Sequence, residues 1–117
     1  MGEINLDATQ VVAVAAFLRV INALENTRSA IANLERALDV GPSDEQLDLL
    51  ELARADTGDA IDVLRAGGLH PDAVLILEQA VEDIQKASNA KKSMKIKQAI
   101  NKAIDAHEDA RDVMVDE

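Results

Sequence analysis

Apolar residues recur every three or four positions through most of the first forty residues. This spacing is typical of one face of an α-helix. The members of the stripe follow one another at spacings of 4, 3, 4, 3, 4, 3 and 4, and they are Ala13, Phe17, Val20, Leu24, Thr27, Ile31, Leu34 and Leu38. Asp7 and Gln10 form a capping-box pattern before the stripe, and Gly41-Pro42 follows it. The pattern predicts one long helix over residues 7–39.

Three further segments show the same periodicity, and we expect helices at 43–66, 71–88 and 90–115. Ser43 begins a second capping-box pattern, Gly67-Gly68 is a typical C-terminal stop, and Pro71 suits a first helical position. The least defined boundary lies between the last two segments. They could form one bent helix, or the break could fall at Ser93.

The predicted fold class is all-α: an antiparallel up-down-up-down four-helix bundle with a long first helix, in a single domain over residues 1–117. The connections are short, which favours antiparallel neighbours, and five glycines and two prolines are too few for an all-β fold. Seven side chains are expected to be almost fully buried in the core: Ile31, Leu34, Leu50, Leu64, Leu77, Ile84 and Ile100.

The first helix is longer than its predicted partners. At about 30 residues it would extend ~45 Å, while the second and third would reach about half to two thirds of that. We therefore expect its N-terminal end to lie partly uncovered, with an interface formed by Val11, Val12, Val14, Ala15, Leu18 and Ile21. A protein partner, a neighbouring domain or a second copy could cover this surface. Alternatively, the other helices tilt and cover it themselves.

Composition and charge exclude several classes of function. The chain has 117 residues and no cysteine, which excludes disulfides, thiolate catalysis, Cys-ligated metals and covalent c-type haem. The net charge of −10 argues against a nucleic-acid partner. All six lysines lie between Lys86 and Lys102; they form either a solvated face beside an acidic helix or a phosphate contact.

The longest apolar run, residues 11–18, is far shorter than the ~20 residues of a membrane span, so we expect none. Met1-Gly2-Glu3 lacks the basic start of a signal peptide. The compartment stays open: cytoplasmic if the chain is complete, periplasmic if it belongs to a cytochrome-type protein.

The candidate chemistry is sparse, and we expect no catalytic residues, no cofactor and no metal site. The chain has two histidines and no Glu-x-x-His motif, so it lacks the donors of a di-iron or three-His zinc site. His70 is expected in an exposed turn that caps a helix, and His107 at the edge of the core near the bundle end. Thr27 and Thr57 either meet across two helices or each bond their own backbone. Arg28 could pair with an acid of the second helix, Asp56 or Asp59.

Residues 4–19, Ile-Asn-Leu-Asp-Ala-Thr-Gln-Val-Val-Ala-Val-Ala-Ala-Phe-Leu-Arg, carry a family resemblance. The segment resembles the last helix of the c-type cytochrome domains in di-haem cytochrome c peroxidase and MauG-like proteins. In that family this helix packs near the haem crevice. The resemblance covers only this segment, and the chain departs from the family because it lacks the Cys-x-x-Cys-His haem motif. It implies a C-terminal accessory bundle whose first helix continues out of a cytochrome domain.

These observations favour a non-enzymatic helical-bundle interaction or accessory module that acts through its first helix. The alternative is a small-ligand or metal-responsive bundle that uses His107 or the acidic cluster as its sensor.

Overall fold

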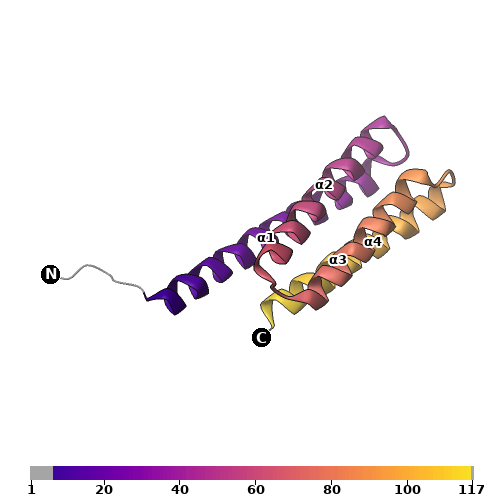
Figure 1. Ribbon diagram of the computed structural model, residues 1–117. Coiled ribbons are helices and arrows are strands. Elements are labelled where there is room, and N and C mark those ends of the chain that lie inside the picture. Colours follow the sequence, from indigo (N-terminus) through magenta and orange to yellow (C-terminus); the bar gives the residue numbers. More distant parts are fainter. Residues whose placement is uncertain (1–6, 117) are drawn as a thin grey trace.

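The computed structural model describes residues 7–116 and confirms the all-α four-helix bundle. Its helices are α1 (Ala8–Val40), α2 (Asp44–Gly67), α3 (Pro71–Asn89) and α4 (Ser93–Val115). The third and fourth segments are separate helices, with the break at residues 90–92. The bundle measures 63 × 26 × 20 Å, and α1 projects beyond the other three helices at its N-terminal end (Figure 1).

The helix ends form largely as the capping patterns predict. The Asp7 side chain accepts a hydrogen bond from the Gln10 backbone N–H at 2.8 Å, and the Gln10 side chain accepts one from the Asp7 N–H at 3.0 Å. Ser43 caps α2 through the backbone N–H of Gln46 at 3.1 Å, but Gln46 does not return the bond. Its side-chain amide instead donates to the Ala37 carbonyl at 3.0 Å, so it ties the start of α2 to the end of α1.

The bundle consists of two helical hairpins, α1–α2 and α3–α4, that lie side by side (Figure 1). Each hairpin closes on small side chains spaced by seven residues. They are all buried: Ala23, Ala30 and Ala37 in α1, Ala53 and Ala60 in α2, Ala73, Ala80 and Ala87 in α3, and Ala103 and Ala110 in α4. Small side chains let two helix backbones approach closely, and contacts between helices are indeed densest within the hairpins. We call these lines of alanines the alanine seams.

The alanine seam of α1 corrects one prediction about the core. Six of the seven predicted core residues are buried: Leu34, Leu50, Leu64, Leu77, Ile84 and Ile100. Ile31 is only half-buried, and so are Leu24 and Leu38 at the same register. Each of these three follows a buried alanine by one position, because the narrow α1–α2 interface admits the alanine and turns the bulkier residue to the flank. The predicted stripe was therefore displaced from the true core line.

Candidate docking surface and buried polar layer

The N-terminal end of α1 extends past the end of α2. α1 has 33 residues, and the other helices have 24, 19 and 23. α2 ends at Gly67, where an added Cβ would lie 2.8 Å from the Cδ of Arg19. The end of α2 therefore packs on α1 at the level of Arg19. Residues 8–18, which lie beyond this level, are called the α1 overhang below (Figure 1).

The α1 overhang exposes bulky apolar side chains. Phe17 is 64% exposed and Leu18 is 58% exposed. Of the predicted interface residues, Val11, Val12, Val14, Ala15 and Leu18 lie in solvent, whereas Ile21 is half-buried against its own bundle. The other helices do not tilt to cover this end. Residues 11–18 are apolar around the whole circumference of the helix, a composition found where a helix is enclosed by other groups.

An apolar groove of about 610 Å³ lies at the base of the α1 overhang, between α1, the end of α4 and the α2–α3 turn. Its bulky apolar lining consists of Phe17, Val20, Ile21, Leu24, Leu69, Met114 and Val115, and His70 also lines it. Sequence reasoning missed the contributions of the turn and of α4, because nothing in the local pattern places Leu69 beside Met114. The groove adds to the exposed apolar surface of the overhang, so both belong to one end of the bundle.

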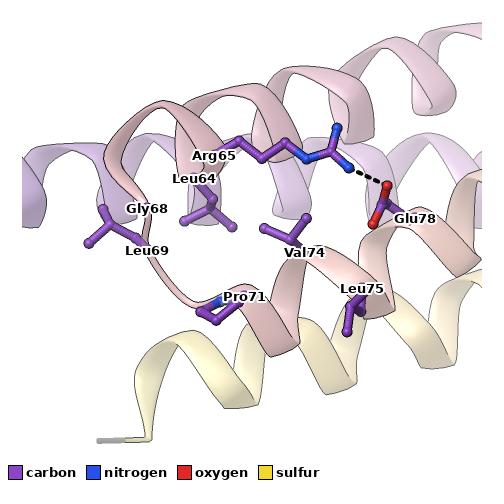
Figure 2. A pocket seen from close by; sticks show the side chains of 8 residues that line it. All are labelled: Leu64, Arg65, Gly68, Leu69, Pro71, Val74, Leu75 and Glu78. Carbon is purple, nitrogen blue, oxygen red and sulfur yellow. Dashed lines mark hydrogen bonds and ion pairs between the residues drawn. The ribbon is translucent and has the colours of Figure 1, made fainter.

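A second hollow, of about 390 Å³, opens on the other side of the α2–α3 turn. Figure 2 shows Leu64, Leu69 and Val74 around it and an ion pair between Arg65 of α2 and Glu78 of α3. Leu69 lines both hollows. The turn between the two hairpins is therefore apolar on both of its sides.

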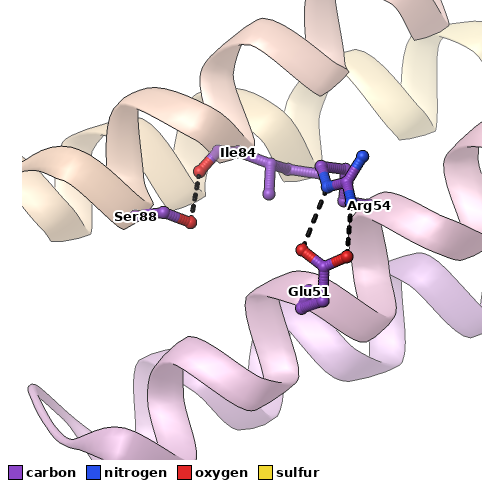
Figure 3. A network of polar contacts seen from close by, with 4 residues as sticks. All are labelled: Glu51, Arg54, Ile84 and Ser88. Atoms are coloured by element: carbon purple, nitrogen blue, oxygen red, sulfur yellow. Dashed lines mark hydrogen bonds and ion pairs between the residues drawn. The ribbon is translucent and has the colours of Figure 1, made fainter.

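The charged side chains of the bundle form few contacts between helices. The ion pair of Glu51 with Arg54 lies within α2, and Ser88 donates to the Ile84 carbonyl of its own helix at 3.1 Å (Figure 3). Arg54 holds the pKa of the Glu51 carboxyl below its ordinary value, chiefly through the hydrogen bond between them. All ion pairs among residues 7–116 involve arginine, and the six lysines are exposed. We call them the lysine face; their exposure fits both interpretations, a solvated face and a phosphate contact.

The predicted ion pair of Arg28 with Asp56 or Asp59 does not form. Asp56 instead accepts hydrogen bonds from Ser29 at 2.7 Å and from Asn33 at 3.1 Å. These shorter polar side chains of α1 reach α2 and donate hydrogen bonds to the Asp56 carboxylate, so Arg28 does not pair with it.

A polar layer of Thr27, Thr57 and His107 divides the apolar core into two clusters, and all three side chains are fully buried. The two threonines follow the second expected arrangement: the hydroxyl of each lies 2.8 Å from a backbone carbonyl oxygen four residues earlier. His107 contradicts its prediction, because it lies in mid-bundle rather than near an end. It occupies the core line of α4, and Thr57 on α2 gives it a polar partner at 2.7 Å.

The hydrogen bonds of His107 define where its protons lie. Nδ1 is 2.6 Å from the Ala103 carbonyl oxygen, which can only accept, so Nδ1 carries a proton. In the neutral ring Nε2 is then an acceptor, and the single hydroxyl proton of Thr57 serves either Nε2 or the Ala53 carbonyl. Burial lowers the pKa of His107; its bond to Ala103 and the charges of Asp56 and Asp83 oppose that shift. The neutral ring is therefore the form that the core favours.

The two histidines lie in different surroundings. Both ring nitrogens of His107 are engaged, and within residues 7–116 no group of three or more metal-donor side chains comes together. His70 does precede α3, with φ of 44°, but its side chain makes no capping bond there. Pro71 holds the first turn of α3 in place instead.

By length and composition alone, α1 is a helix that could cross a membrane, and its most apolar stretch is almost unburied. Core helices of soluble proteins and signal sequences meet the same criteria, so this is weak evidence for a span. No protein family, no curated protein and no solved structure matches the chain.

Proposed function

We propose that this protein is a non-enzymatic helical module that docks onto another protein surface through the α1 overhang. The observation that carries the proposal is the exposure of bulky apolar side chains around the whole circumference of residues 11–18. Contiguous apolar patches of this size are rare on isolated soluble proteins and typically mark an interaction site. The rest of the bundle is the rigid support that holds this helix out.

The family resemblance of residues 4–19 is compatible with such a role; residues 4–6 lie outside the described part of the chain. In the form that the resemblance implies, the overhang would be the closing helix of a c-type cytochrome domain, and the bundle its C-terminal appendage. The chain would then hold no haem of its own. On this hypothesis, an enclosing domain supplies the apolar surroundings that residues 11–18 require.

The alternative of a metal-responsive bundle has less support. His107 uses both nitrogens within the core, and the exposed carboxylates of α2 do not converge on one point among the described residues. A ligand sensor would need a polar cavity with groups free to bind. The two hollows beside the α2–α3 turn are mainly apolar, and a third, of about 420 Å³ between α3 and α4, offers charged groups from Lys86, Lys95 and Lys102 of the lysine face.

Site-specific photo-crosslinking tests the proposal. A benzoylphenylalanine in place of Leu18 would lie on the overhang, and the same residue in place of Leu52 gives a matched control, because Leu52 is exposed on α2. On irradiation in native cells, we expect a discrete adduct from position 18 and none from position 52. Equal or absent adducts at the two positions would contradict docking through the overhang.

A further inference from the structure

The groove beside the α1 overhang points to one occupant. We propose that the overhang of a second copy lies in this groove, antiparallel to α1, and that the two copies exchange overhangs about a two-fold axis. The inference rests on the proposed function, because it names the partner that the overhang meets. It is drawn from the shape, the charge and the area of this end of the bundle.

The shape of this end is self-complementary. One molecule offers both a projecting apolar helix and an apolar groove at its base. If two α1 helices lie antiparallel, each places its overhang in the groove of the other, which is the reciprocity of a two-fold interface. Ala13 and Ala16 line the groove together with Phe17 and Val20. If the two-fold axis passes near the middle of this stretch, the antiparallel copy places its small residues opposite the bulky ones, which favours close packing.

The same mode of pairing already builds each hairpin. Ala16 continues the alanine seam of Ala23, Ala30 and Ala37 by one further interval of seven residues. Within the bundle that seam receives α2 as an antiparallel neighbour. Beyond Gly67 the seam continues along α1, but α2 has ended. A second α1 in the groove would cover Ala16, the last alanine of this line.

Charge and area are consistent with a second copy. Between residues 8 and 24 the only charged side chain is Arg19, whereas residues 39–83 carry a net charge of −10. Two copies therefore meet with little repulsion at this end, whereas two α2 helices would repel each other. Val11, Val12, Val14, Phe17 and Leu18 of the overhang are each about half exposed or more, so a pair would remove apolar area of both copies from water.

Sedimentation equilibrium of the full chain tests the dimer. We expect a concentration-dependent monomer–dimer equilibrium for the wild type. Phe17→Asp should raise the dissociation constant at least about tenfold, because it would bury an unpaired carboxylate. Leu52→Asp, the same change at another exposed apolar site, should leave the dissociation constant unchanged. A wild type that stays monomeric at high micromolar concentration overturns the dimer, and so does an equal effect of the two variants.

Single cysteines test the antiparallel arrangement, since the natural chain has none. Ala16→Cys lies near the proposed axis and should form a disulfide with itself under mild oxidation. Thr9→Cys and Leu24→Cys lie at opposite ends of the overlap, so each alone should stay monomeric and their mixture should cross-link. Efficient self-linking of Thr9→Cys would overturn the antiparallel arrangement.

The photo-crosslinking experiment separates failure of the dimer from failure of docking. If the wild type is monomeric and position 18 cross-links to a different protein, the second copy is overturned as the occupant and docking through the overhang survives. If it is monomeric and position 18 gives no adduct, both proposals fail.

Discussion

In the first third of α1 bulky apolar side chains lie in solvent, whereas in its last third two alanines and one leucine are completely buried. Phe17 and Leu18 of the overhang are more than half exposed, while Ala30 and Ala37 are completely buried. The two regions belong to one uninterrupted helix with one period. They differ in whether α2 runs beside them.

The difference shows that burial in this helix depends on the neighbour and not on hydropathy. Where α2 is present, the closest approach of the two backbones selects alanine, and larger residues such as Ile31 move to the flank. Where α2 is absent, no such selection operates, and the helix carries large apolar residues all round. A surface that would be costly for an isolated bundle is then best understood as a surface for something else.

Truncation of leucine should give the largest contrast between the two regions. Leu34→Ala removes a fully buried side chain and should lower the free energy of unfolding by about 2–5 kcal/mol, through lost burial and the cavity left behind. Leu18→Ala is the matched change in the overhang and should alter it by less than about 0.5 kcal/mol. Urea denaturation followed by circular dichroism measures both values. Similar losses would mean that the overhang is covered by its own bundle.

Enlargement of alanine should give the next largest contrast. Ala30→Leu places extra carbons in the narrow α1–α2 interface and should destabilise the fold by about 1–3 kcal/mol, because the helices cannot separate freely. Ala15→Leu, at an exposed position, should be nearly neutral. Thermal melts of the two variants provide the measurement. A neutral Ala30→Leu would contradict the view that the seam sets the helix separation.

Most of the fold could be predicted from the sequence, because helix periods and capping residues are local signals. The four helices begin and end within about three residues of their predicted bounds. The choice of core face on α1 could not be predicted as well. Bulky residues dominated the pattern at Phe17, Leu24 and Ile31, whereas the register is determined by the contact with α2. A seven-residue repeat of alanine in all four helices was the signal that could have corrected it.

The candidate site was predictable only in part. The uncovered end of α1 followed from helix lengths, and five of the six named interface residues are exposed. The groove could not be predicted, because it brings together Leu69 and Met114 from distant parts of the chain. His107 was misplaced for a similar reason. Its position on the apolar line of α4 was visible, but Thr57, the partner that makes mid-bundle burial tolerable, comes from α2.

The free energy of unfolding should depend on pH through the polar layer and not through the apolar core around it. Because burial lowers the pKa of His107, the unfolded chain takes up a proton near its ordinary pKa of 6.5 while the folded chain resists. The contribution of the neutral ring to the free energy of unfolding is fully present above that pKa. It is lost as the pH falls through this value, with a slope of at most about 1.4 kcal/mol per pH unit. Urea titrations between pH 7.5 and 5.5 measure the slope.

His107→Gln is the control for this titration. The substitution should remove the part of the pH dependence of stability that comes from His107, while His70 is still present. It should lower the free energy of unfolding by more than the change of about 1 kcal/mol expected of an edge position, because two buried hydrogen bonds are disturbed. An unchanged slope in this variant would assign the pH dependence to other groups.

The smallest effect on stability should accompany the largest effect on association. Val14→Asp and Leu18→Asp introduce charge on exposed parts of the overhang, so they should change the free energy of unfolding by less than about 0.5 kcal/mol and leave the helical content intact. Both should abolish docking onto a partner that encloses the overhang, because a carboxylate cannot be buried in an apolar interface without a partner. They should weaken the dimer less than Phe17→Asp does, because neither side chain lines the groove. Circular dichroism and sedimentation velocity on the same samples measure the two effects. If either substitution instead lowers stability by several kcal/mol at protein concentrations where the wild type is monomeric, these side chains are packed within their own bundle. The contrast between the two regions of α1 would then disappear, and with it the reason to assign the overhang a partner.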